Sequence, residues 1–290
     1  MIMNSLNIVF FSGTGCTALC AETLKRSLEE LGATVSIDEL REEGQWPLHI
    51  SAEMLVIMFP VHSFDAPLPI FEYLEKLEPA KGIPAAILAV SGGGEVVSNR
   101  ACNLATRRGL EKKGYPVVYE AMFVMPCNTM VATPRLAGTA LLKKLPAKAD
   151  EIARDIIAGI ERRFDPPLID RLCARLGKYE RKYQYREKFS QRIQVGETCS
   201  SCGLCARSCP RDNIEMDGGT PCFKTNCAIC LKCIYGCPRQ ALTAGYGSSL
   251  VLKGGFALSS FANEAYPNAD EIEPLLKGFI WHGVRGYLNS

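Results

Sequence analysis

The sequence predicts a doubly wound α/β domain built on a five-stranded parallel sheet, followed by a small α+β domain rich in cysteine. Three observations lead to this fold class. Short, continuously apolar runs alternate with segments of helical periodicity over residues 1–165. Such alternation is typical of a parallel sheet that is covered by helices on both faces. A proline pair at 166–167 then ends the pattern, and two evenly spaced sets of cysteines follow.

Five apolar runs are expected to form the strands of the sheet. They cover residues 6–11, 35–37, 54–59, 83–90 and 117–125. Between and after them, apolar residues recur at helical spacing. The helices are expected over residues 17–31, 69–77 and 97–113, with one long helix or a pair of helices over 136–163.

The loops that follow three of the strands are the first place to look for a ligand. They are residues 12–17, 60–69 and 91–95. In open α/β sheets, ligands bind in the crevice outside the carboxyl ends of the strands. We therefore expect these three loops to meet at one edge of the sheet and to form a binding site there.

Composition sets bounds on the class of protein. With 290 residues, 47% hydrophobic and 22% charged, the chain is ordinary for a globular protein of two domains. A net charge of +2 gives no reason to expect nucleic acid or a membrane surface as a partner. The apolar runs are far shorter than the roughly 20 residues of a membrane helix. Residues 6–11 are interpreted as a strand rather than a signal peptide, so a soluble, cytoplasmic protein is expected.

The cysteines carry the most specific signal. Nine of the fourteen lie between residues 199 and 237, and eight of these follow the pattern C-x2-C-x2-C-x3-C-P twice. This run is typical of bacterial ferredoxins, in which the fourth cysteine of each set binds the other cluster. The sequence therefore predicts two [4Fe–4S] clusters. The first would be held by Cys199, Cys202, Cys205 and Cys237, and the second by Cys227, Cys230, Cys233 and Cys209.

Zinc is the alternative occupant of this segment. Zinc sites usually combine two C-x2-C pairs across a longer gap, whereas here a third cysteine follows after only two residues and would crowd a tetrahedral ion. Residues 209–214 and 237–242 also resemble each other beyond the cysteines, which indicates an internally duplicated module. Cys222 lies outside both repeats and is expected to be a spare thiol.

The first strand-to-helix loop has the chemistry of an anion site. Small and hydroxyl residues join the first strand to a helix start, where backbone N–H groups favour negative charge. These residues are Ser12, Gly13, Thr14, Gly15, Cys16 and Thr17. No lysine follows the glycines, so the loop is not that of a nucleotide hydrolase. It resembles the flavodoxin loop that holds the terminal phosphate of FMN, although Cys16 stands where flavodoxins most often have asparagine. An ordinary capped turn is the alternative.

The second and third loops would then contact the flavin ring. The second contributes Pro60, Val61, His62, Ser63 and Phe64, and the third contributes Ser91, Gly92, Gly93 and Gly94. Glycine permits a close approach of the backbone to a ligand. The alternatives are a surface histidine and glycines that serve only a turn. The third loop lacks the aromatic residue that stacks on the ring in ordinary flavodoxins.

Together these features resemble the flavodoxin–ferredoxin fusion family over about residues 5–245. The resemblance is carried by residues 12–17, 90–94, 112–115 and 125–128 and by the cysteine repeats. It implies a flavodoxin-like FMN domain, placed at 1–165, and a ferredoxin-like domain with two [4Fe–4S] clusters, placed at 195–245. The polar, basic residues between them predict a helical connector at 166–194. It also implies that residues 125–128, including Asn128, border the flavin. Residues 246–290 lie outside the resemblance, and their role is left open.

The expected function is an electron relay between the two clusters and FMN, and on to a redox protein partner. The alternative is an FMN-dependent reductase of a small molecule, with His62, Cys127 or Asn128 as proton donor. The basic segment 171–192 would either dock an acidic partner or pack on the first domain as a solvated connector, and its length leaves a homodimer open. The end of the chain would either cover the cofactor or pack as an ordinary amphipathic segment.

Overall fold

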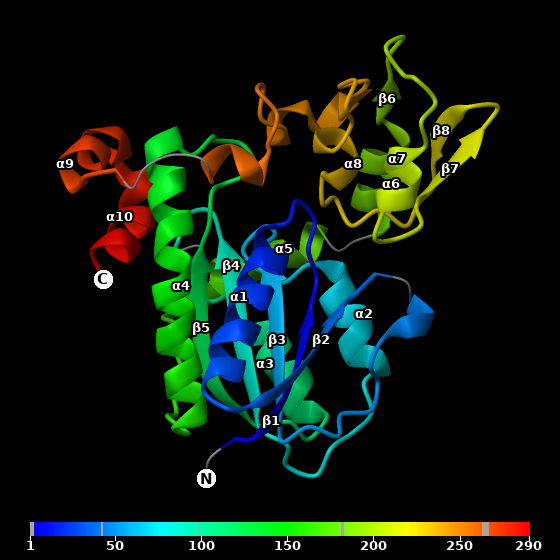
Figure 1. The fold of residues 1–290 in the computed structure, drawn as a ribbon. Helices are drawn as coiled ribbons and strands as arrows, with labels where there is room; N and C mark the ends of the chain where they lie inside the picture. The colour runs from blue at the N-terminus through cyan, green and yellow to red at the C-terminus, as the bar shows by residue number, and fades with distance from the viewer. Residues whose placement is uncertain (1–2, 42, 98, 181–182, 263–266) are drawn as a thin grey trace.

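The computed structural model describes residues 3–41, 43–97, 99–180, 183–262 and 267–290 (Figure 1). Residues 98, 181 and 182, which fall within the predicted third helix and the connector, lie outside the described residues, as do 1–2, 42 and 263–266. Five parallel strands form one sheet in the order β2-β1-β3-β4-β5, which confirms the predicted sheet. The strands are β1 (Ser5–Phe10), β2 (Thr34–Glu39), β3 (Met54–Pro60), β4 (Ala85–Ser91) and β5 (Val117–Val124).

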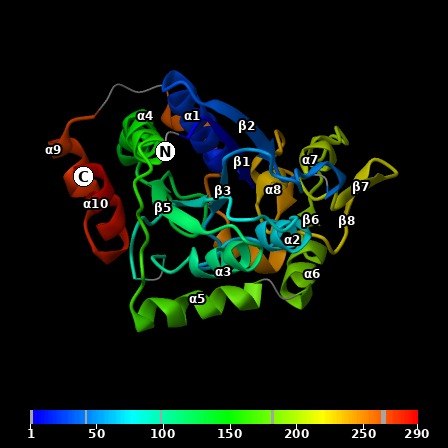
Figure 2. The ribbon, with the colours of Figure 1, turned by 90° about the horizontal axis from the view of Figure 1, so that it is seen from below.

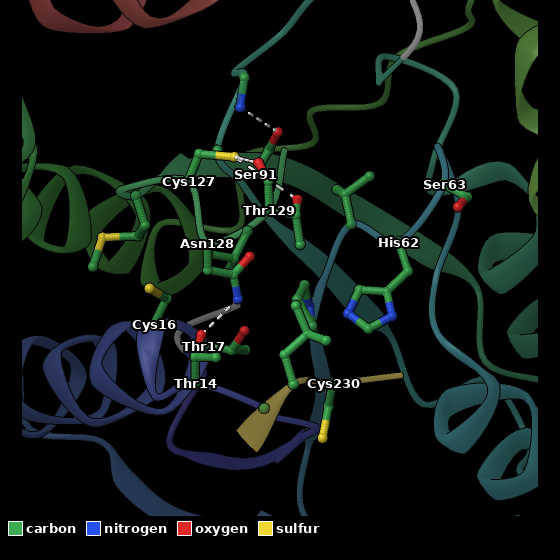
Figure 3. Close-up of a pocket in the computed structure, with 18 of the residues that line it drawn as sticks. Thr14, Cys16, Thr17, His62, Ser63, Ser91, Cys127, Asn128, Thr129 and Cys230 are labelled. Atoms are coloured by element: carbon green, nitrogen blue, oxygen red, sulfur yellow. Dashed lines mark hydrogen bonds between the residues drawn. The ribbon is translucent and has the colours of Figure 1, made fainter. Parts of the chain in front are cut away.

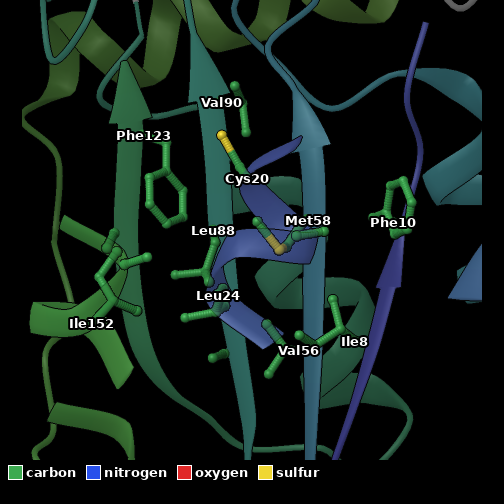
Figure 4. Packing of buried hydrophobic residues seen from close by; sticks show 14 of the residues in the cluster. Ile8, Phe10, Cys20, Leu24, Val56, Met58, Leu88, Val90, Phe123 and Ile152 are labelled. Carbon is green, nitrogen blue, oxygen red and sulfur yellow. The ribbon is translucent and has the colours of Figure 1, made fainter. Parts of the chain in front are cut away.

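Helices cover both faces of this sheet, as the continuously apolar strands predicted (Figures 1 and 2). Helices α1 (Cys16–Glu30) and α4 (Arg135–Ile157) pack together on one face, and α2 (Leu68–Lys76) and α3 (Leu104–Lys112) pack together on the other. Figure 4 shows the first of the two cores, where Val56, Met58 and Leu88 of the strands meet Leu24 of α1 and Ile152 of α4. The sheet is thus a rigid support for the loops at its edge.

The strand order defines where a ligand can enter. The chain leaves β1 to form β2 on one side and returns to form β3 on the other, with both strands paired to β1. Adjacent crossover connections therefore diverge outside the carboxyl ends of β1 and β3. This is the switch point at which doubly wound folds bind their ligands.

Two helices of the first domain differ from their predicted bounds by more than one residue. Helix α3 begins at Leu104 rather than at residue 97. The side-chain amide of Asn99 donates to Ser91 Oγ at 2.9 Å and to the Gly94 carbonyl at 3.0 Å, and these bonds hold the preceding residues against the third loop. Helix α4 is a single helix of 23 residues that continues through Pro146. It ends at Ile157, six residues before the predicted end, and Arg162 instead forms an isolated β-bridge with Tyr119.

The connector and the cysteine-rich segment follow. Helix α5 (Leu168–Glu180) is anchored by buried Asp170, which pairs with Arg100 at 2.9 Å. Helix α6 (Tyr183–Gln191) leads into the cysteine-rich segment. That segment contains the antiparallel pair β6 (Gln194–Val195) and β9 (Leu242–Thr243), the hairpin β7 (Ile214–Asp217) and β8 (Thr220–Phe223), and the short helices α7 (Leu204–Ser208) and α8 (Lys232–Tyr235).

The end of the chain packs on the first domain. Leu252, Phe256 and Phe261 join the core of the α1–α4 face. Further along, α9 (Ala269–Ile272) and α10 (His282–Asn289) lie against α4, with Trp281 and Val284 buried on it (Figure 1). Of the two expectations for the end of the chain, packing as an ordinary amphipathic segment is therefore the one that the structure shows. Among the described residues, no helix combines the length and the apolar character that crossing a bilayer requires.

Candidate functional site

A cavity of about 310 Å3 lies at the carboxyl ends of β1, β3, β4 and β5 (Figure 3). The three predicted loops and the segment after β5 line it together. Of the predicted cofactor residues, the lining contains Ser12, Gly13, Thr14, Cys16, Thr17, Pro60, Val61, His62, Ser63, Phe64, Ser91, Gly92, Gly93 and Asn128. Residues from four separate loops thus converge on one space.

The first loop presents an open helix start to the cavity. Helix α1 begins at Cys16, and its N-cap Gly15 has a φ of 100° and no side chain to bond the first-turn N–H groups. Ser12 Oγ accepts a hydrogen bond of 3.2 Å from the Ala18 backbone N–H. Burial raises the pKa of the Cys16 thiol to about 12, so this thiol is neutral at physiological pH. No thiolate therefore opposes the partial positive charge that the helix dipole places at the start of α1.

Asn128 ties the first loop to the segment after β5. Its side-chain amide donates a hydrogen bond of 2.7 Å to Thr14 Oγ1, and Figure 3 shows the two residues reaching toward each other. Next to it, the Cys127 thiol donates to the Thr129 carbonyl at 3.1 Å, and the Cys127 backbone N–H donates to Thr133 Oγ1 at 2.8 Å. These bonds fix the position of the segment at the cavity.

The second loop is a tight turn with a strained backbone. His62 and Asp65 exchange two backbone hydrogen bonds of 2.9 Å each. Between them, Ser63 and Phe64 have φ values of 44° and 69°, a left-handed conformation that glycine or asparagine usually occupies in such turns. Strain of this kind persists where the surrounding structure over-determines it, and it clusters at binding and active sites.

The third loop approaches the Cys127 segment closely. A Cβ added at Gly92 would lie 2.6 Å from the Cβ of Cys127, so only glycine fits there. Two predicted glycines lie outside the cavity lining. Gly15 serves as the N-cap of α1. Gly94 turns away to pack on the backbone of Gly283, where an added Cβ would come within 2.7 Å of Gly283.

Several lining residues were not among the predicted contacts. From the first domain these are Val90, Asn99, Thr129 and Met130, and from later segments they are Tyr185, Ile229, Cys230, Leu231 and Leu250. One of them is aromatic, namely Tyr185 of the connector. The later residues reach the cavity only because distant parts of the chain pack together. Local sequence patterns cannot predict such packing.

The eight repeat cysteines gather into two groups of four around two small cavities. Cys209, Cys227, Cys230 and Cys233 line one cavity. Cys199, Cys202, Cys205 and Cys237 line the other. Each group takes three cysteines from one repeat and the fourth from the other, and all fourteen cysteines are free thiols. Within the described ranges, no group of three or more His, Cys, Asp or Glu side chains is arranged to hold a single metal ion.

The two repeats also match in backbone conformation. Left-handed residues recur at equivalent positions, with φ values of 56° and 53° at Ser201 and Ile229, and 68° and 60° at Gly203 and Leu231. A third pair, Asp212 and Gln240, has φ values of 46° and 49°. These turns aim backbone N–H groups inward. The Ile229 N–H donates to Cys227 Sγ and the Ala241 N–H to Cys237 Sγ, both at 3.3 Å.

The cysteine-rich segment packs directly on the first loop of the cavity. A Cβ added at Gly13 would lie 2.6 Å from the Cys230 carbonyl oxygen, so this contact is backbone against backbone. Arg211, whose side chain is 3% exposed, pairs with Glu72 of α2 at 2.7 Å. Cys230 and Leu231 line both the large cavity and the cavity of the Cys209 group.

The strand order β2-β1-β3-β4-β5, with helices on both faces, defines the first half of the chain as a flavodoxin-like α/β domain. Solved structures similar to this half include a flavodoxin from the domain Archaea, with 15% identity, 52% of this chain and 98% of that chain covered, and a TM-score of 0.37. A Streptococcus pneumoniae TIGR4 flavodoxin has 16% identity, coverage of 54% and 99%, and a TM-score of 0.39.

The NAD(P)H:quinone oxidoreductase from Methanothermobacter marburgensis is also similar, with 14% identity, 54% of this chain and all of that chain covered, and a TM-score of 0.40. These structural neighbours cover about half of the chain. Comparison of the sequence with models of protein families and with curated proteins gives no match.

Proposed function

We propose that this protein is an electron-transfer iron–sulfur flavoprotein that binds FMN and two [4Fe–4S] clusters and passes electrons between them and a redox protein partner. One observation carries the proposal. The chain forms two groups of four free cysteines, and one group lies next to a strand-end cavity of a flavodoxin-like domain, with Cys230 lining both that cavity and the cavity of its own group. Bound flavin accepts and donates electrons singly or in pairs, whereas iron–sulfur clusters exchange them singly.

The residues of the large cavity suit FMN. The open start of α1 and the hydroxyls of Ser12, Thr14 and Thr17 would hold the phosphate, because backbone N–H groups at a helix start bind anions. The second and third loops and Asn128 would border the ring. Tyr185 adds an aromatic surface at the same cavity, which supports a planar ligand.

The two cysteine groups suit [4Fe–4S] clusters. Four thiolates per group match the ligand number of a cubane, and the crossed fourth cysteine matches the bacterial ferredoxin arrangement. Backbone N–H groups that donate to Cys227 and Cys237 would stabilise the negative charge on the sulfurs. We assign residues 195–245 to this ferredoxin-like domain, residues 1–165 to the FMN domain and residues 166–194 to the connector.

The experiment is anaerobic reconstitution of the full chain with iron, sulfide and FMN, followed by assays of all three. We expect about eight irons per chain, as two [4Fe–4S] clusters require, together with one flavin. Fewer than four irons per chain, or no flavin after reconstitution, would contradict the relay. Zinc bound in place of iron would instead favour a structural role for the cysteines.

A small-molecule reductase is the second candidate. It is favoured by proton-bearing side chains at the cavity, namely His62 and Cys127. The volume of about 310 Å3 lies at the lower end of the range for ligand pockets, so one bound cofactor would fill most of it. A search for small molecules that reoxidise the reduced protein at a saturable rate would distinguish the two functions, because saturation requires a binding site for the small molecule.

A further inference from the structure

The two cysteine groups are not equivalent in their relation to the large cavity. Two residues, Cys230 and Leu231, line both that cavity and the cavity of the Cys209 group. The cavity of the Cys199 group has no lining residue in common with the large cavity among the described residues. Only the Cys209 group is therefore separated from the large cavity by a single layer of residues.

The repeats differ in sequence at the positions that form this layer. The first repeat has Ser201 and Gly203 at its two left-handed positions, and the second has Ile229 and Leu231. Glycine and small polar residues tolerate this conformation, whereas a β-branched residue there is a strained outlier. In the second repeat a β-branched residue, Ile229, and a bulky one, Leu231, adopt this conformation, and both line the large cavity. We call residues 229–231 the apolar wall.

The apolar wall is largely buried, whereas most of the corresponding part of the first repeat faces solvent. Ile229 and Leu231 are 8% and 3% exposed. The alternate residues Ala228 and Cys230 pack into the core of the α2–α3 face of the first domain. In the first repeat, the equivalent residues Ser201 and Cys202 are exposed, and Gly203 is buried.

We propose, resting on the function proposed above, that the cluster of the Cys209 group exchanges electrons with FMN directly through the apolar wall, within one chain. The Cys199 group is the outer site. An electron from a one-electron donor protein enters beside exposed Cys202, passes to the Cys209 group and crosses the wall to the flavin. The donor loses one electron and the flavin gains one. The chain needs no second copy to complete this path.

The test uses the full chain reconstituted with iron, sulfide and FMN, and a redox titration in which the reduced clusters are followed by electron paramagnetic resonance. The same titration without FMN shows which cluster responds to the flavin, because a charge change at one redox site shifts the potential of its neighbour. Three variants are compared with the wild type. Ile229→Ala and Ser201→Ala place the same residue at equivalent positions of the two repeats, and Leu231→Gly introduces the residue of the first repeat.

We expect FMN to shift the potential of one cluster only, and Ile229→Ala and Leu231→Gly to raise the potential of that same cluster. The potential rises because water admitted at the wall stabilises the more negative, reduced form. Ser201→Ala leaves that cluster unchanged. The proposal is overturned if Ile229→Ala moves the cluster that FMN does not affect, if Ser201→Ala moves the FMN-sensitive one, or if neither cluster responds to FMN. A chain that takes up no flavin, or fewer than four irons, contradicts the proposed function itself.

Discussion

The hydroxyl of Tyr235 donates a 2.7 Å hydrogen bond to the backbone carbonyl of Asn128 and accepts one of 2.9 Å from the backbone N–H of Leu252. Tyr235 lies in α8 of the cysteine-rich segment, whereas Asn128 borders the strand-end cavity and donates to Thr14 across it. One phenol thus joins the cysteine-rich segment, the cavity and the C-terminal segment.

Replacing Tyr235 with phenylalanine should weaken FMN binding and lower the free energy of unfolding. The change leaves the Asn128 carbonyl and the Leu252 N–H without their partner, and each lost hydrogen bond costs about 1 kcal/mol. The measurements are flavin titration and urea denaturation. Tyr119→Phe is the matched control, because the Tyr119 hydroxyl donates to Asp155 at 2.8 Å away from the cavity lining. It should lower stability and leave flavin affinity unchanged, and an equal loss of affinity in both variants would contradict the prediction.

Gly283 of α10 supports the third loop, so Gly283→Ala should displace that loop. An added Cβ would lie 2.3 Å from the carbonyl oxygen of Gly93, and overpacking of this kind costs about 1–3 kcal/mol. We expect weaker FMN binding and a lower melting temperature, measured by flavin titration and thermal denaturation. Gly286→Ala, in the same helix with no atom within 4 Å of the added Cβ, should preserve both. Unchanged flavin affinity in Gly283→Ala would show that α10 does not position the loop.

The pair between Arg211 and Glu72 anchors the cysteine-rich segment on α2. The side chains are 3% and 24% exposed, and removing one partner of a buried pair typically costs about 3–5 kcal/mol. Glu72→Gln should therefore destabilise the chain strongly and expose the segment to proteolysis. The control is Glu29→Gln, which removes the surface pair with Lys25 and should cost at most about 0.5 kcal/mol. Limited proteolysis and urea denaturation of both variants test this, and similar losses would refute it.

The buried thiols of α1 should make stability fall at alkaline pH. Burial raises the pKa of Cys16 from 9.0 to about 12 and also raises that of Cys20. Above pH 9 the unfolded chain loses these protons while the folded chain keeps them, so the unfolded state binds fewer protons and the free energy of unfolding decreases. This stabilisation is complete below pH 9 and is lost as the pH rises toward 12. Urea midpoints between pH 8 and pH 10.5 should fall less steeply in Cys16→Ala, and an identical slope would exclude Cys16 as a contributor.

The sheet and most loops of the cavity could be predicted because their signals are local. Strands such as β3 and β4 are buried on both faces and are apolar throughout, and parallel strands place their following loops at one edge. The pairing of Cys209 and Cys237 with the opposite repeat was expected from the resemblance of the repeats to the bacterial ferredoxin pattern. The predicted start of α3 was wrong because the side-chain hydrogen bonds of Asn99 to the third loop depend on tertiary structure.

The parts that escaped prediction are contacts between distant segments. Tyr185 reaches the cavity from the connector, and Gly283 touches the third loop from nearly 190 residues further along the chain. The strained conformation of Ile229 is equally invisible, because β-branched residues rarely adopt positive φ. Neither hydropathy nor motif spacing carries information about such packing.

Because the fourth cysteines are exchanged, one sequence repeat does not by itself form one complete group of four cysteines. Each repeat supplies only three cysteines to its own cavity and takes the fourth from its counterpart. A polypeptide that held one repeat alone would complete a set of four only by associating with a second copy of itself. If the module arose by gene duplication, the ancestral half was therefore a homodimer, and joining the halves in one chain removed its dependence on concentration.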